Sequence, residues 1–117
     1  MKISEIQTIL QADVLNGIDL LDLDIEYGWS CDLMSDVLAF VKNDVVLLTG
    51  LVHPQVIRTA EMLDIKAIVF VRGKKPGDEI IRMARDREIV ILATDHTLYT
   101  ASALLHIGGL AGEEGLK

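Results

Sequence analysis

Residues 45–73 constrain the fold of this chain more than any other stretch. A short run of apolar residues, 45–48, is followed by a turn at Thr49 and by a segment whose apolar residues recur at helical spacing. The chain then passes through a second apolar run, 67–71, to another turn at Arg72. Unbroken apolar runs joined by an amphipathic helix are typical of a βαβ unit, because parallel strands are buried on both faces of their sheet.

The rest of the chain extends this unit. A third apolar run begins at residue 89, so the three runs start at 45, 67 and 89, which are 22 residues apart. No low-complexity tract or linker divides the chain. The sequence therefore predicts a single α/β domain over residues 1–117, with three layers and a mostly parallel sheet of about four to five strands flanked by helices. Helices outside the central unit are predicted over 5–12, 33–41, 78–88 and 98–106.

Local signals predict where these helices begin and end. Ser4 and Gln7 have the spacing of a capping box, and Asp32 is expected to cap the helix over 33–41. The glycine pair at 108 and 109 is expected to end the last helix, and residues 108–117 to form a flexible tail.

Residues 21–32 alternate between apolar and polar residues, which predicts a strand with one wet face at or near a sheet edge. Its polar side carries Asp22, Asp24 and Glu26. Such a row of acids can hold a metal ion, but on an edge strand it more often keeps the edge from pairing with other chains. We therefore expect no metal site here.

Composition excludes several classes of partner. The chain has 18 acidic and 11 basic residues and a formal charge of −7, which disfavours binding to a nucleic acid backbone. Its one cysteine, Cys31, allows neither an intramolecular disulfide nor a cysteine cluster for zinc. No apolar run approaches the roughly 18 to 20 residues that span a bilayer, and the first residues lack a signal core, so we expect a cytoplasmic protein without a membrane partner.

The carboxyl ends of the predicted strands collect the polar residues with chemical potential. In open α/β sheets ligands bind at this edge, where helix amino termini direct free amide donors toward them. Gly50 is expected to be required for its backbone, through a positive φ or the close approach of a ligand. The candidate ligand-binding residues are Thr49, Gly50, His53, Arg72, Thr94, Asp95 and His96.

Several of these residues have a plainer interpretation. Asp95 and Thr97 are both suited to cap the last helix, and His53 precedes a proline, which favours an extended loop conformation. His96 adjoins an acid that can orient it, although a structural role is the commoner one. The basic cluster after the second strand, which includes Arg72, is also compatible with a solvated loop.

No catalytic motif accompanies this site. The chain has no phosphate-binding loop, no dinucleotide-binding glycine pattern, no zinc-protease motif and no nucleophile elbow. We therefore expect neither enzyme activity nor a cofactor, and no residue is assigned a catalytic role.

The order of elements, the stretch from Thr49 to Pro76 and the later turn Thr94-Asp95-His96-Thr97 resemble the DRTGG domain family over Ile3 to about Ile107. One departure is that Leu51-Val52 follow the glycine where many members carry Asp-Arg. The family is similar in fold to the amino-terminal domain of HPr kinase, and occurs beside phosphotransacetylase and CBS-containing pyrophosphatase modules.

The resemblance implies a regulatory domain that is often a homodimer and in some pyrophosphatases lies beside adenine-nucleotide sites. Some short relatives are associated with iron-only hydrogenase systems. Two functions therefore stay open: a non-catalytic module that senses an adenine nucleotide or another small anion at the strand ends, and an interaction module that docks on an enzyme.

Overall fold

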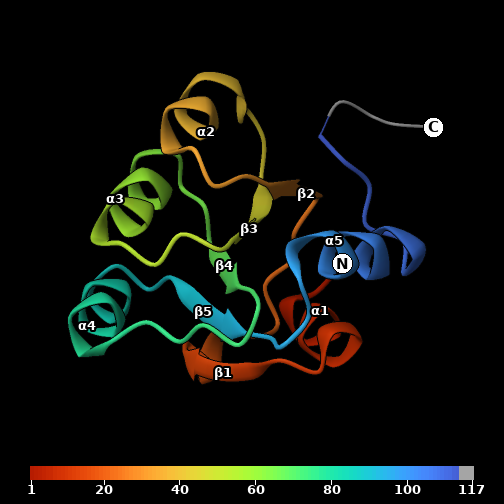
Figure 1. Ribbon diagram of the computed structural model, residues 1–117, viewed down its shortest axis with the longest axis horizontal. Coiled ribbons are helices and arrows are strands. Elements are labelled where there is room, and N and C mark those ends of the chain that lie inside the picture. The colour runs from red at the N-terminus through yellow and green to blue at the C-terminus, as the bar shows by residue number, and fades with distance from the viewer. Residues whose placement is uncertain (114–117) are drawn as a thin grey trace.

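A computed structural model of the chain describes residues 1–113, and these form a five-stranded sheet between two layers of helices (Figure 1). The sheet order is β1-β5-β4-β3-β2; β2 to β5 are parallel, and β1 is antiparallel to β5. The predicted fold class is confirmed. The elements are α1 (Ile3–Leu10), β1 (Asp13–Asn16), the 3₁₀ turn η1 (Ile18–Leu20), β2 (Tyr27–Ser30), α2 (Met34–Phe40), β3 (Val45–Thr49), α3 (Pro54–Met62), β4 (Ala67–Phe70), α4 (Asp78–Asp86), β5 (Val90–Ala93) and α5 (Leu98–Ile107).

Each face of the sheet has its own core. Helices α2, α3 and α4 cover one face, and α1 and α5 cover the other (Figure 1). Successive residues of a strand point to opposite faces, so in β3 the side chains of Val46 and Leu48 enter the core under α1 and α5, while those of Val45 and Leu47 enter the core under α2 to α4. Burial on both faces explains why the strands could be recognised as unbroken apolar runs.

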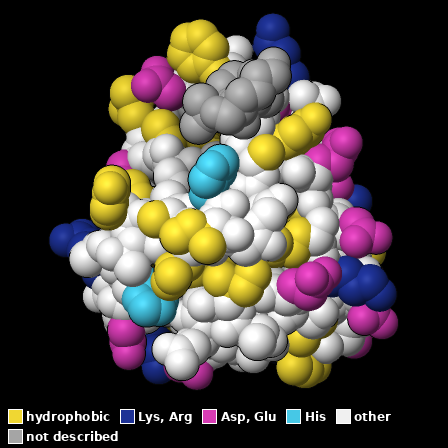
Figure 2. All heavy atoms as spheres, turned by 90° about the vertical axis from the view of Figure 1, so that its right-hand side faces the viewer, with side chains coloured by type: hydrophobic (Ala, Val, Ile, Leu, Met, Phe, Trp, Pro, Cys, Tyr) yellow, Lys and Arg dark blue, Asp and Glu magenta, His cyan; other side chains and the backbone are white. Residues whose placement is uncertain are grey.

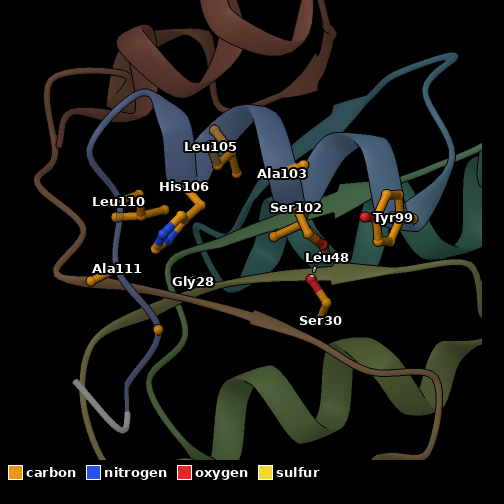
Figure 3. A pocket seen from close by; sticks show the side chains of 11 residues that line it. Gly28, Ser30, Leu48, Tyr99, Ser102, Ala103, Leu105, His106, Leu110 and Ala111 are labelled. Atoms are coloured by element: carbon orange, nitrogen blue, oxygen red, sulfur yellow. Dashed lines mark hydrogen bonds between the residues drawn. The ribbon is translucent and has the colours of Figure 1, made fainter. Parts of the chain in front are cut away.

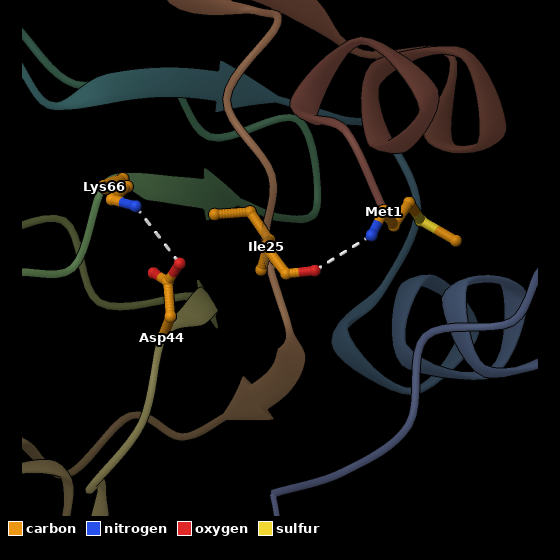
Figure 4. Close-up of polar contacts among 4 residues, drawn as sticks. All are labelled: Met1, Ile25, Asp44 and Lys66. Atoms are coloured by element: carbon orange, nitrogen blue, oxygen red, sulfur yellow. Dashed lines mark hydrogen bonds and ion pairs between the residues drawn. The ribbon is translucent and has the colours of Figure 1, made fainter.

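The strand predicted over residues 21–32 is wrong for most of its length, because only Tyr27–Ser30 joins the sheet. Its position at a sheet edge is confirmed. The preceding residues bond to the amino-terminal segment instead: the Met1 amino group donates to the Ile25 carbonyl at 3.0 Å (Figure 4), and the Ile3 amide donates to the Leu23 carbonyl at 3.0 Å. Ile25 is buried under α1 and α5, whereas Tyr27 packs on the opposite face. The chain therefore crosses the sheet edge within the alternating pattern.

An ion pair connects the amino ends of β3 and β4. Lys66, just before β4, reaches Asp44, just before β3, with a distance of 3.2 Å from Nζ to Oδ2 (Figure 4). The Asp44 backbone carbonyl also accepts the amide of Tyr27 at 3.1 Å. These contacts connect β2, β3 and β4 at their amino ends. The candidate site residues lie at the opposite, carboxyl ends of the strands.

Both predicted helix caps are wrong. Helix α1 begins before Ser4, and the Glu5 carboxylate accepts the Lys2 amide at 3.0 Å, whereas the Gln7 side chain donates to the Ala12 carbonyl at 3.2 Å. Leu33 is the residue that precedes α2, and it provides no side-chain hydrogen bond. The carboxylate of Asp32 binds elsewhere, as described below.

The flexible tail predicted from residue 108 does not hold for residues 108–113. Leu110 is 4% exposed and packs against the core under α5, and the Ala111 carbonyl accepts the Gly28 amide at 2.9 Å. The Glu113 carboxylate accepts the Lys42 amide at 2.7 Å and also the Asn43 amide. Residues 108–113 are thus held by the burial of Leu110 and by hydrogen bonding to the outer edge of β2. The rest of the predicted tail, 114–117, lies outside the described residues. Within residues 1–113, no helix is both long and apolar enough to cross a membrane.

Candidate functional site

The carboxyl end of β3 is joined to the end of β2 through one carboxylate. Asp32 Oδ1 accepts a hydrogen bond from the Thr49 hydroxyl at 2.9 Å and another from the Gly50 amide at 2.7 Å. The Thr49 hydroxyl in turn accepts the Leu51 amide at 3.1 Å. Asp32 thus occupies the amide donor that parallel sheets commonly offer to a ligand, and it holds the turn after β3 in one conformation.

Two cationic side chains converge on this turn from the loop after β4. Lys74 Nζ donates to the Gly50 carbonyl at 3.0 Å. Arg72 Nη2 lies 3.6 Å from the point that a Cβ atom on Gly50 would occupy, and the Asp32 carboxylate oxygens lie 3.7 Å from the same point. We call these five residues, Asp32, Thr49, Gly50, Arg72 and Lys74, the strand-end platform.

The next turn along the sheet is bonded to the platform through the backbone. The Arg72 amide donates to the His96 carbonyl at 2.8 Å, and the Gly73 amide donates to the Thr94 carbonyl at 2.9 Å. Arg72 and Gly73 both have positive φ, 60° and 69°, which turns the loop sharply toward β5. Asp95 Oδ1 lies 3.2 Å from the position of a Cβ on Gly73, so glycine leaves room for that carboxylate.

The structure separates the predicted site residues into two groups. Thr49, Gly50 and Arg72 meet directly, whereas His96 and Asp95 border them through the turn after β5. The other two, Thr94 and His53, are engaged elsewhere.

The Thr94 hydroxyl is buried and donates to the Leu10 carbonyl at 2.8 Å, and His53 Nδ1 accepts the Gln55 amide at 3.0 Å as the cap of α3. Thr97, rather than Asp95, caps α5 through the Thr100 amide.

Sequence reasoning did not include Asp32 and Lys74 among the site residues. Asp32 directly precedes a helix and was therefore assigned as its cap, yet it also ends a strand adjacent to β3, which is the signal that places it at the platform. The positive φ that was one of the two expectations for Gly50 is absent, and a Cβ there would be at ordinary contact distance from the Arg72 and Asp32 side chains.

The platform carries mixed charge and does not resemble a metal site. Arg72 and Lys74 supply two positive charges and Asp32 supplies one negative charge, and Asp95 in the neighbouring turn adds a second negative charge. Within residues 1–113 no three histidine, cysteine or acidic side chains are grouped as a metal ion requires. The arrangement is suited to hydrogen bonding with an anionic group on the side of the cations.

A cavity of about 480 Å³ lies beside the platform, between α5 and β2 (Figure 3). We call it the α5 groove. The Ser30 and Ser102 hydroxyls meet across it at 2.6 Å, and His106 points toward the segment after α5 (Figure 3). None of the predicted site residues lines it. The lining residues are Gly28, Ser30, Leu48, Tyr99, Ser102, Ala103, Leu105, His106, Leu110, Ala111 and Gly112.

The topology explains why the cavity lies here. Strands β2 to β5 follow one another without reversal, and their connecting helices all cover one face, so the parallel strands have no switch point at which a crevice would open. After β5 the chain crosses to the other face, where α5 packs over β2 and β3. The face that carries α5 shows hydrophobic side chains in a band across its middle and most charged side chains toward its rim (Figure 2).

Comparison with known proteins identifies the fold and leaves the family open. No family model matches the chain, and no curated protein matches it. A solved structure of the CBS and DRTGG domains in the regulatory region of Clostridium perfringens pyrophosphatase, in complex with the activator diadenosine tetraphosphate, is similar with a TM-score of 0.73 at 18% sequence identity. The match covers 99% of this chain and 50% of the other, so the chain spans about half the length of that structure. It therefore shares the fold of part of a regulatory region.

Proposed function

We propose that this domain is a non-catalytic regulatory module that binds a phosphate-bearing small molecule, with an adenine nucleotide as the first candidate, at the strand-end platform. The observation that carries the proposal is the convergence of Arg72 and Lys74 on the Gly50 turn. A guanidinium can grip a phosphate at two points, and a neighbouring ammonium adds a second charge. The backbone bonds from Arg72 and Gly73 to the turn after β5 hold the guanidinium's loop in place.

The fold comparison supports this choice of ligand class. The similar structure belongs to the regulatory region of a pyrophosphatase and contains a dinucleotide activator.

Calorimetric titration of the wild type and two variants tests the proposal. A thermal-shift panel of ATP, ADP, AMP, diadenosine tetraphosphate and pyrophosphate first selects the ligand, because binding to the folded state raises the melting temperature. Arg72→Ala should then weaken binding about tenfold or more, since a hydrogen bond to a charged group contributes about 1.5–3 kcal/mol. Lys75→Ala is the matched control: it removes one positive charge from the same loop, and Lys75 is engaged with Asp13 at 3.4 Å on the surface.

The two variants separate a specific site from general charge attraction. Lys75→Ala should bind within about twofold of the wild type, because Lys75 is paired with Asp13 on the surface and is not part of the platform. Equal losses in both variants would indicate non-specific attraction, and no shift with any member of the panel would refute the proposal. Arg72→Ala should unfold within about 0.5 kcal/mol of the wild type, so a loss of binding would not reflect a loss of fold.

A second candidate function, an interaction module, is favoured by α2. This short helix and its preceding residue expose three large apolar side chains: Leu33 is 58% exposed, Phe40 57% and Leu38 38%. Apolar side chains gathered on one exposed element mark interaction sites, and two-fold pairing of identical chains is the commonest assembly. We propose that α2 pairs with α2 of a second copy, and that an enzyme partner, if the domain serves one, docks on the same helix.

Light scattering at tens of micromolar tests this pairing. The wild type should have the mass of a dimer, and Phe40→Ser should have the mass of a monomer. Ile18→Ser is the control, because Ile18 is 72% exposed but lies in η1, outside α2. A wild type that is monomeric, or a dimer that persists in Phe40→Ser, would exclude α2 as the interface.

A further inference from the structure

We infer that the α5 groove receives the ring of the same ligand whose phosphate the platform holds, so that the ligand is a nucleotide lying across both. The inference rests on the proposed function and adds a second binding site to it. The two sites are continuous along the sheet: Ser30 and Leu48 line the groove, and Asp32 and Gly50 lie two residues further along the same two chain segments. Two residues of extended chain span about 7 Å, which is comparable with the separation of base and phosphate in a mononucleotide.

The lining of the groove fits an uncharged ring. None of its lining residues is Asp, Glu, Lys or Arg, although a quarter of the chain is charged. Its volume of about 480 Å³ lies within the range of about 300–1,000 Å³ that is usual for small-molecule sites. Tyr99 is 84% exposed at the first turn of α5, close to the strand-end edge, where its ring is free to stack on a base (Figure 3).

The hydroxyl pair in the groove determines which edge of a ring it can recognise. Ser102 Oγ donates its proton to the Leu98 carbonyl at 2.7 Å. Because a hydroxyl has only one proton, Ser30 must be the donor in the 2.6 Å bond between the two serines. Ser30 Oγ then keeps its acceptor capacity toward the groove. It can accept a hydrogen bond from the ligand, so the groove favours a ring with an N–H donor, such as the amino group of adenine.

Asp32 lies between the two ends of such a ligand. Both of its hydrogen bonds from Thr49 and Gly50 go to Oδ1, and within residues 1–113 no hydrogen bond is made to Oδ2. A carboxylate oxygen accepts hydrogen bonds from sugar hydroxyls, as acids near the strand ends of dinucleotide-binding folds do. The platform and groove thus provide, in order, cations for a phosphate, an acceptor for a ribose hydroxyl, and a neutral slot with an acceptor for a base.

The test compares ATP with its two halves, tripolyphosphate and adenosine, by calorimetric titration without magnesium. Wild-type protein should bind ATP at least about tenfold more tightly than tripolyphosphate. Tyr99→Ala should weaken ATP binding about fivefold or more, the usual effect of losing one stacking contact with a base, and leave tripolyphosphate binding unchanged. Ser102→Leu, which fills the groove, should likewise weaken ATP binding and leave tripolyphosphate binding unchanged. Ile107→Ala is the control on the same helix, because Ile107 is 81% exposed and does not line the groove.

The outcomes distinguish this inference from the proposed function. If ATP and tripolyphosphate bind equally well and the groove variants bind both like the wild type, the platform stands and the ring site is refuted. If tripolyphosphate does not bind but adenosine does, and Ser102→Leu abolishes adenosine binding, the groove stands and the platform is wrong. If none of the three binds to the wild type, both are refuted.

Discussion

Thr94 is a predicted ligand residue that the structure assigns to stability instead. Its hydroxyl is 2.8 Å from the carbonyl of Leu10, in the last turn of α1, where carbonyl groups have no partner within the helix. Thr94 is 2% exposed and Leu10 is fully buried, so water cannot replace the hydroxyl. Thr94→Val keeps the shape of the side chain and leaves the carbonyl unpaired, which should cost about 1–3 kcal/mol.

The size of the effect can be converted into a melting temperature. An unfolding entropy of about 2.1 cal/mol/K per residue, over 117 residues, gives a shift of about 4 °C for each kcal/mol. Thr94→Val should therefore melt about 4–12 °C below the wild type. In urea its midpoint should fall while the slope of the transition stays unchanged, because the surface exposed on unfolding is the same.

The control for Thr94→Val is Thr8→Val. Thr8 is also a threonine whose hydroxyl donates to a backbone carbonyl, that of Ser4 at 3.0 Å, but it is exposed and water can take the place of the hydroxyl. Its loss should cost no more than about 0.5 kcal/mol. A difference between the two variants below about 0.5 kcal/mol would contradict the reasoning. Because the Thr94 hydroxyl is engaged with α1, Thr94→Val should also leave nucleotide affinity unchanged.

Four further variants test other parts of the structure. Asp32→Asn removes a negative charge beside the platform cations and should tighten pyrophosphate binding severalfold in calorimetry; weaker binding would show that the charge assists the site. Gly17→Ala should lower the free energy of unfolding by about 1–2 kcal/mol or more in urea, because Gly17 has a φ of 90° and a new Cβ would lie 2.8 Å from Val90 Cγ2. At Gly28 a Cβ would meet its nearest neighbour at 3.4 Å, so Gly28→Ala should differ from the wild type by a few tenths of a kcal/mol at most. Leu110→Ala should cost about 2–4 kcal/mol, and a cost below about 1 kcal/mol would mean that residues 108–113 contribute little to the fold.

The parallel strands could be predicted because their burial on both faces is visible in the type of each residue. A strand buried on both faces has to be apolar throughout, and three such runs at equal spacing leave few alternatives to repeated βα units. The segment over 21–32 shows the limit of the same logic. Its alternation indicated which residues pack against a core, but those before Tyr27 pack on one face of the sheet and those after it on the other, which periodicity alone does not show.

The site shows a second limit. Arg72 and Thr49 were expected at one edge because the carboxyl ends of parallel strands meet there, and this argument needs only the strand assignments. The role of Asp32 depends on β2 lying next to β3, and its hydrogen-bond partner Thr49 is 17 residues away along the chain. The α5 groove depends on where α5 crosses after β5, and no residue of α5 indicates by itself which strands it will cover.

The position of β1 sets the order in which the chain can fold. Neighbouring parallel strands pair across short separations, as Val46 with Ala67, whereas Asp13 of β1 pairs with Ala93, 80 residues later. Each doubling of loop length adds about 0.6 kcal/mol to the entropic cost of closing the loop, so pairing β1 with β5 costs about 1 kcal/mol more than pairing two neighbouring parallel strands. β1 therefore has no partner in the sheet until β5 has been made. We expect β1 to be the last strand to join the sheet.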